Sequence, residues 1–255
     1  PRGLCLEFAL GRSYSAADTA SCGLLTETDC VEILERDKLP RNRFAGVREH
    51  RLITDPRVFG TDTGEGAWAG FGNLVYLADA RLVPAGETGM HSHREIDVIS
   101  VMVEGRLQHQ GSLGHGQSLA TDEVQVHRAG AEQFSHNEIN PDDSHNRLIQ
   151  IWVLPQGEGG AADYRHYHLN AGGLTRVYGG EPDQGDTFPA DTILQVACLN
   201  SGQSMDVDVP FLAYLTRGKG FANEDLITDG TLLRGDQLTF DCVEDAQLIL
   251  VHLQA

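Results

Sequence analysis

From Phe44 onward, short apolar runs alternate with turn residues along the chain. The runs span residues 74–84, 96–105, 147–155, 193–199, 211–218 and 247–253. Gly, Asn and Asp lie between them, and apolar segments of this length between such residues are typical of β-strands. Many short strands at close spacing predict an all-β protein of the sandwich or barrel kind.

The strand pattern is repeated once. VISVMVEGRL followed by IQIWVL resembles FLAYLTRGKG followed by LILVHL, with an acidic turn between the two runs in each copy. Gly105 and Asp122 are 17 positions apart, and the matching Gly218 and Asp236 are 18 apart. The repeat predicts two copies of one β unit. The glycine-rich stretch 157–160 is expected to join them.

These features divide the chain into three parts. Residues 1–42 hold three of the five cysteines and show weak periodicity, so they are interpreted as an N-terminal extension. Whether that extension is ordered or a disordered tail stays open. Residues 43–160 are expected to form the first β domain, and residues 161–255 the second.

Composition excludes several classes of partner. The 255 residues carry a net charge of -18, and this charge disfavours direct contact with nucleic acid or anionic membranes. The early apolar stretch 4–10 contains Glu7 and is too short to span a bilayer. Five widely spaced cysteines argue against a disulfide framework or a thiolate zinc site and fit a reducing compartment. The expected location is the cytoplasm.

Two short motifs carry the candidate chemistry, His91-Ser92-His93 and His136-Asn137-Glu138. Residues i and i+2 of a strand point to the same face. Two such pairs on neighbouring strands can therefore direct three imidazoles and one carboxylate at one point. This donor set suits a first-row transition metal and leaves coordination positions open. The spacing predicts a metal site at His91, His93, His136 and Glu138.

The runs HSHREIDVISVMVEGRLQHQGSLG, VQVHRAGAEQFSHNEINPDD and RLIQIWVLP together resemble the pirin family of the cupin superfamily. The resemblance is good over residues 44–170 and looser elsewhere. It implies two tandem cupin β-barrels, with a metal, usually iron, only in the N-terminal barrel. The implied ligands are the same four residues, and the second copy lacks their counterparts. Iron(II) is the expected cofactor, and nickel, manganese, cobalt, copper and zinc suit the same donors.

The chain departs from the family pattern in two places near these motifs. Five residues separate Gly130 from His136, where four are expected, so the shape of this loop is in question. Asp97 stands where a glutamate is usual. The shorter carboxylate is expected to affect the support around the metal ligands more than the ligands themselves.

The resemblance implies an enzyme of the quercetin 2,3-dioxygenase type, which opens a flavonol ring with O2. Small aromatic substrates and O2 would be its partners, and Glu138 would accept the substrate's proton. The alternative is a metal- and redox-dependent regulatory protein that binds a transcription factor or another protein. A third interpretation is a structural cupin in which the metal only stabilises the barrel. An enzyme needs an open cavity for a planar ligand, whereas a sensor needs a closed site.

The remaining histidines are given structural roles. His166 and His168 form another His-x-His pair, but a plain strand is favoured there. His109 and His115 flank a predicted hairpin and are expected to face solvent. His127 has no partner at ligand spacing.

Overall fold

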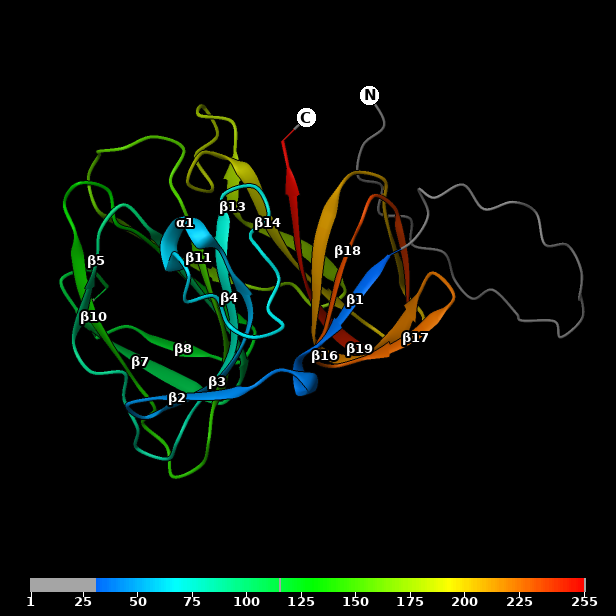
Figure 1. Ribbon diagram of the computed structural model, residues 1–255, viewed down its shortest axis with the longest axis horizontal. Coiled ribbons are helices and arrows are strands. Elements are labelled where there is room, and N and C mark those ends of the chain that lie inside the picture. The colour runs from blue at the N-terminus through cyan, green and yellow to red at the C-terminus, as the bar shows by residue number, and fades with distance from the viewer. Residues whose placement is uncertain (1–30, 115, 255) are drawn as a thin grey trace, which may run out of the picture.

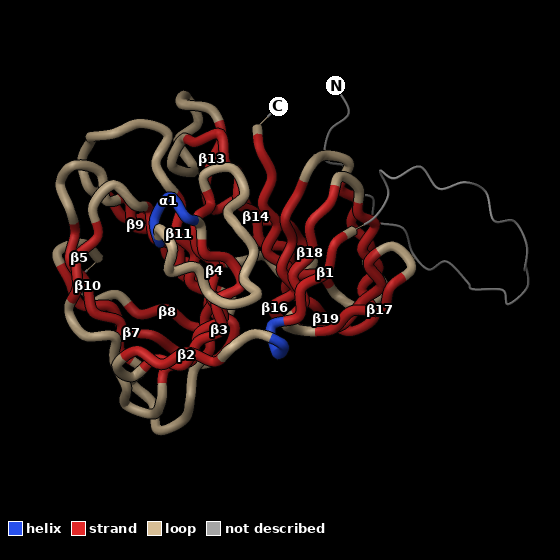
Figure 2. Tube along the Cα trace, viewed as in Figure 1, coloured by secondary structure: helices blue, strands red, loops and turns tan. Residues whose placement is uncertain are grey.

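The computed structural model describes residues 31–114 and 116–254, and these residues are almost entirely β-strand. Two sheets face each other in the left half of Figure 1 and form the first barrel, and a third sheet forms the second barrel on the right. Figure 2 shows strands throughout, with the helical segments α1 (Pro56–Phe59) and η1 (Arg36–Lys38) outside the sheets. The predicted all-β fold is confirmed.

The first barrel consists of a seven-stranded and a four-stranded sheet. The larger sheet has the order β12 (Asp163–His168), β9 (Glu123–Arg128), β6 (Asp97–Glu104), β11 (Arg147–Val153), β4 (Leu74–Leu82), β3 (Val47–Thr54) and β2 (Arg41–Phe44). The smaller sheet has the order β5 (His91–His93), β10 (Phe134–Ile139), β7 (Arg106–Gly111) and β8 (Ser118–Ala120). The strand pairs within both sheets are antiparallel, as expected from the short turns between strands.

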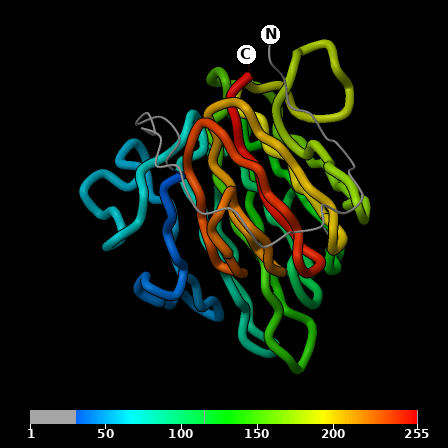
Figure 3. The backbone as a smooth tube through the Cα atoms, turned by 90° about the vertical axis from the view of Figure 1, so that its right-hand side faces the viewer, coloured from blue at the N-terminus to red at the C-terminus, as the bar shows by residue number. Residues whose placement is uncertain are grey.

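The second barrel is one eight-stranded sheet. Its main path runs β1 (Glu32–Glu35), β18 (Thr231–Gly235), β16 (Phe211–Ala222), β19 (Leu238–Leu253), β14 (Ala190–Leu199) and β13 (Gly173–Gly180). The strands β15 (Ser204–Val207) and β17 (Asp225–Thr228) pair with β19 and β16. Register shifts along the β16–β19 pair mark bulges, which bend a sheet. In Figure 3 the strands β16 to β19, orange to red, lie in front of the green strands of the first barrel.

Alternation along β19 shows how the two barrels are joined. Leu248 and Leu250 belong to the apolar core inside the second barrel. Ile249 and Val251 point to the opposite face, where they share one core with Ile99 of the first barrel. Because both faces of these strands are buried, the sequence shows continuous apolar runs rather than strict alternation of apolar and polar residues.

Sheet pairing crosses the boundaries predicted from the sequence. Residues 31–42 of the predicted extension include β1, which pairs with β18 of the second barrel, and the start of β2, which lies in the first (Figure 1). Residues 1–30 lie outside the described part of the chain. The strand β12 falls after the predicted boundary at residue 160, yet it pairs with β9 of the first barrel. The division into domains stays a prediction, with β1 and β12 as the strands that do not follow it.

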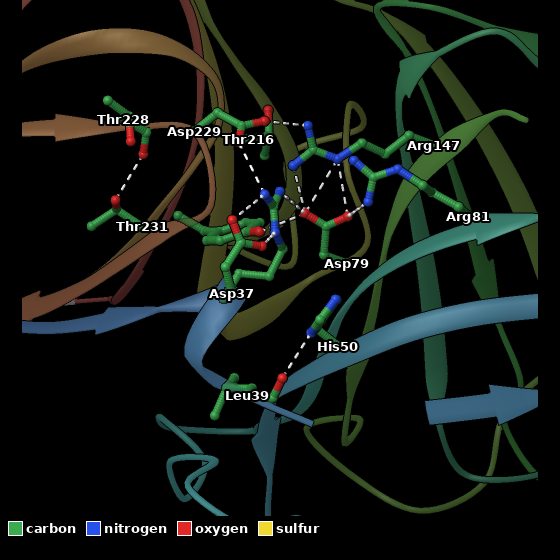
Figure 4. Close-up of polar contacts among 12 residues, drawn as sticks. Asp37, Leu39, His50, Asp79, Arg81, Arg147, Thr216, Thr228, Asp229 and Thr231 are labelled. Atoms are coloured by element: carbon green, nitrogen blue, oxygen red, sulfur yellow. Dashed lines mark hydrogen bonds and ion pairs between the residues drawn. The ribbon is translucent and has the colours of Figure 1, made fainter. Parts of the chain in front are cut away.

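A buried cluster of charges lies where the two barrels meet. Figure 4 shows Asp79 of β4 between Arg147 and Arg81, with Asp229 of the second barrel close to Arg147. The Asp79 side chain is completely shielded from solvent. The cluster therefore links segments that are far apart in the sequence.

Candidate metal centre

The strands β5 and β10 bring the two histidine motifs together. They pair antiparallel, with His136 opposite His91 and Phe134 opposite His93. The five residues between Gly130 and His136 are compatible with this register. At Gly130 itself φ is +36°, and an added Cβ would lie 2.5 Å from the carbonyl oxygen of Gly160. Only glycine fits so close an approach without strain.

Three imidazoles converge on one point. The Nε2 atom of His136 lies 3.0 Å from Nε2 of His91 and 3.2 Å from Nε2 of His93. Nitrogens that share one metal at about 2.0–2.1 Å, at angles of roughly 90–110°, lie about 2.9–3.4 Å apart. The observed separations therefore fit three nitrogens of one coordination sphere.

The protonation of these rings also suits a metal. The Nδ1 atom of His91 lies 2.8 Å from the carbonyl oxygen of Gly89. That oxygen accepts a hydrogen bond from Nδ1–H, which leaves the Nε2 lone pair free. Burial, together with the neighbouring His91, lowers the pKa of His93 to about 4. Burial and the surrounding imidazoles also lower the pKa of His136. Neutral imidazole is the form that binds metal.

Glu138 lines the same cavity, and its carboxylate is hydrogen-bonded by residues of β6 and β9 in the larger sheet. Its Oε1 atom accepts hydrogen bonds from Ser100 Oγ at 2.9 Å and from Gln125 Nε2 at 3.1 Å. Burial raises the pKa of Glu138 to about 7, although both hydrogen bonds act in the opposite direction. A bound cation beside this carboxylate would lower the pKa and favour the ionised form. Among the described residues, the ligand atoms of His91, His93 and His136 lie within 4.8 Å of one another, and Glu138 is not part of that group.

A cavity of about 530 Å³ opens onto this cluster. Its lining includes the four expected ligands, the aromatic residues Phe44, Tyr76 and Trp152, and the charged residues Glu49, Arg51 and Arg94. The rings of Tyr76 and Trp152 lie 4.5 Å apart, and Trp152 contacts His93 edge-on at 5.4 Å. Aromatic side chains therefore line the cavity beside the histidines.

The sequence did not reveal Ser100 and Gln125 as partners of Glu138. Both lie within apolar strands, on β6 and β9, and both are fully buried. The signal in the sequence was a polar side chain in the middle of an apolar strand. A buried polar group needs a hydrogen-bond partner, but the sequence does not say which one.

Asp97 contacts a different set of residues. Its Oδ2 atom accepts hydrogen bonds from the Arg128 guanidinium at 2.9 and 3.0 Å and from the Tyr178 hydroxyl at 2.8 Å. Ala129 N donates to Oδ1 at 3.3 Å. These contacts tie the first barrel to Tyr178 of the second. The role of Asp97 in supporting the metal ligands stays a prediction.

Two other histidines lie deeper than expected. The prediction that His109 faces solvent is wrong, because His109 points inward from β7 and is 1% exposed. His127 is fully buried, and its ring lies 4.4 Å from that of His109. Together with His136 they form a second group of clustered ligand atoms. Only the long-range pairing of strands brings them together, so spacing in the sequence gave no sign of it. His115 lies outside the described residues.

The comparisons with known proteins cover the part of the chain that carries this site. Residues 62–153 match the Pirin family model. This part of the chain is a pirin domain. The matched residues include all four expected ligands, His91, His93, His136 and Glu138, and the predicted resemblance is confirmed.

Relatives of this pirin domain extend the match into the second half. A Zymomonas mobilis protein named "Putative quercetin 2,3-dioxygenase" is 28% identical over 189 residues, covering 68% of this chain and 79% of the relative. A pirin-like protein of Caulobacter vibrioides is 26% identical, covering 71% of this chain and 83% of the relative.

A solved structure shares the fold. The bacterial pirin YhhW from Escherichia coli, in complex with nickel(II), superposes with a TM-score of 0.74 at 18% identity. The superposition covers 88% of this chain and 99% of YhhW. The two-barrel cupin architecture predicted from the sequence is thereby confirmed. The histidine cluster and the nickel-bound neighbour support a divalent metal without specifying which one. Among the described helices, none has the length and apolar character needed to cross a membrane.

Proposed function

We propose that this chain is a metal-dependent dioxygenase of flavonol-like aromatic substrates, with O2 as the second substrate. His91, His93, His136 and Glu138 would hold one divalent metal, with Fe(II) as the first choice and nickel, manganese, cobalt, copper or zinc as alternatives. The observation that carries the proposal is the aromatic-walled cavity that opens directly onto the histidine cluster. The relatives named for quercetin 2,3-dioxygenase activity support the same chemistry.

A bound divalent metal would supply a Lewis acid that binds and orients a deprotonated hydroxyl group. The protein's own residues account for the rest. Tyr76 and Trp152 present ring faces and edges against which a planar aromatic ligand packs. The largely apolar wall excludes water from the ligand's face.

Glu138 is the catalytic residue in this proposal. Its buried carboxylate would accept the proton of a substrate hydroxyl. Burial raises its pKa to about 7 without a metal and strengthens it as a base, whereas a bound cation acts in the opposite direction. Ser100 and Gln125 both donate hydrogen bonds to Oε1. The other oxygen, Oε2, would then be the one that meets the metal or the substrate hydroxyl. A proton held at Glu138 would be available again for the product.

The regulatory alternative receives less support from the geometry. A metal-dependent sensor needs a closed site, whereas this site adjoins a cavity of about 530 Å³. Protein partners and a cytoplasmic location stay predictions from the sequence.

The direct test is the oxygen-dependent loss of flavonol absorbance. Metal-loaded protein is mixed with quercetin without air, and O2 is then admitted. We expect bleaching only after O2 is added. Glu138→Gln is expected to slow it by about 100-fold or more, because the amide cannot accept the proton.

Glu49→Gln is the matched control, because Glu49 lines the same cavity but bonds Tyr76 and Arg51 instead of facing the histidines. We expect less than about a tenfold effect there. Unchanged turnover in metal-loaded Glu138→Gln would contradict the catalytic role. Absence of bleaching in the metal-loaded native chain would contradict a flavonol substrate.

A further inference from the structure

A second group of metal-binding side chains lies on the paired strands β9 and β12. In this register His168 lies opposite Glu123, and His166 lies opposite Gln125. His166 and His168 are separated by one residue, so both point to the face that carries Glu123. The Nδ1 atom of His168 is 3.0 Å from Glu123 Oε1, and the Nε2 atom of His166 is 3.4 Å from Glu123 Oε2.

A simple ion pair leaves part of this arrangement unexplained. The Nε2 atom of His166 is shielded from solvent and has no hydrogen-bond partner of acceptable geometry among the described residues. The two imidazole rings meet edge-on at 4.9 Å, which brings both to one carboxylate from neighbouring positions. The three candidate ligand atoms lie within 4.8 Å of one another. A buried polar atom without a partner often marks the place of an ion or a water.

The carboxylate is also held in place from behind. The backbone N–H of Ala120 donates to Glu123 Oε2 at 2.8 Å. A hydrogen bond of this kind orients a ligating carboxylate. Since all three ligands are on two hydrogen-bonded strands, their backbone positions are fixed before a cation binds.

We propose that Glu123, His166 and His168 form a second site for a divalent transition metal. Two imidazoles and one carboxylate suit zinc, nickel, cobalt, copper or iron, and they suit magnesium and calcium poorly. The His168 side chain is 76% exposed, so a cation can enter from solvent and complete its coordination with water. A bound cation would join the edge strand β12 to β9.

The second site is independent of the proposed function. It shares no ligand with the centre at His91, His93, His136 and Glu138. A different, fully buried group, His109 with His127 and His136, does share His136 with that centre and is not separable from it. The Glu123 site is therefore the one whose occupancy can be tested alone.

The test is the number of cobalt(II) ions that the demetallated chain of 255 residues binds, measured by calorimetry and by the absorbance of bound cobalt. We expect two equivalents for the native chain and one for the double variant His166→Asn, His168→Asn. The single variant His168→Asn changes an exposed side chain, so it preserves the fold, and it should weaken the second binding step at least about tenfold.

Two controls make the result specific. His145→Asn alters an exposed histidine outside both clusters and should keep two equivalents. His136→Asn should lose the first equivalent and keep the one at Glu123. Binding of a single equivalent by the native chain, or a second equivalent that survives in the double variant, would overturn the proposal. Neither outcome bears on whether the first centre turns over a flavonol.

Discussion

Replacing Asp79 with alanine is expected to lower the free energy of unfolding by about 3–5 kcal/mol, because it leaves buried guanidinium groups without their counter-charge. The Asp79 carboxylate accepts hydrogen bonds from Arg147 Nε at 3.0 and 3.2 Å, from Arg36 Nη1 at 3.0 Å and from the Tyr214 hydroxyl at 2.6 Å. Arg36 and Arg147 are both buried. One carboxylate on β4 therefore connects η1, β11 of the first barrel and β16 of the second.

Urea denaturation of the native chain and the Asp79→Ala variant measures this effect. Asp229→Ala is the matched control, because Asp229 contacts the same Arg36 and Arg147 but its side chain is 36% exposed. Water can solvate the guanidinium groups that lose Asp229 as a partner. We therefore expect Asp229→Ala to lower the free energy of unfolding by about 1 kcal/mol. Equal effects of the two substitutions would contradict the central role of Asp79.

The same carboxylate gives a pH dependence of known sign. Burial raises the pKa of Asp79, but the contacts with Arg147, Tyr214 and Arg36 outweigh it and hold the pKa below its usual range. Because the folded-state pKa lies below the unfolded value of about 3.9, this contribution to stability is complete above that value. It is lost as the pH falls through the folded pKa. The difference in unfolding free energy between native and Asp79→Ala protein should therefore shrink below about pH 4.

The local pattern of the sequence predicted much of the fold and the main cluster. Apolar runs between turn residues predicted the strands, and the i, i+2 spacing of His91 with His93 placed both side chains on one face. Both are properties of a single strand, so no knowledge of its partners is needed. The expectation that the two motifs lie on neighbouring strands followed from their order and from the family resemblance, whereas the register that sets His136 opposite His91 comes from the structure.

Features that depend on distant pairing were not predicted. β1 joins the second barrel although the chain enters the first barrel directly after it, and composition carries no sign of this exchange. The inward position of His127 depends on the neighbours of β9, and a histidine within VQVH gives no indication of what surrounds it. Likewise, Asp79 in LADARL shows one acidic residue in an apolar run, while its partners come from positions 36, 147 and 214.

Replacing His136 with alanine is expected to weaken metal binding at the first centre by about 100-fold or more. Loss of even an outer partner of a metal ligand costs about 10–100-fold, and His136 is expected to be a ligand itself. Its Nε2 atom lies within 3.2 Å of both neighbouring imidazole nitrogens, so no other side chain occupies a comparable central position among the three. The substitution leaves two imidazoles and one carboxylate, with a gap between them.

The measurement is competition for the metal against a chromophoric chelator, in chains that all carry both His166→Asn and His168→Asn so that the second site does not contribute. His145→Ala serves as the control, since it removes an exposed imidazole of the same size. An unchanged affinity in His136→Ala would show that the converging nitrogens do not hold the metal. If instead the metal is lost and oxygen-dependent bleaching of quercetin persists, the centre is real but the proposed dioxygenase chemistry is wrong. The joint loss of metal and turnover is the outcome that the geometry of β5 and β10 leads us to expect.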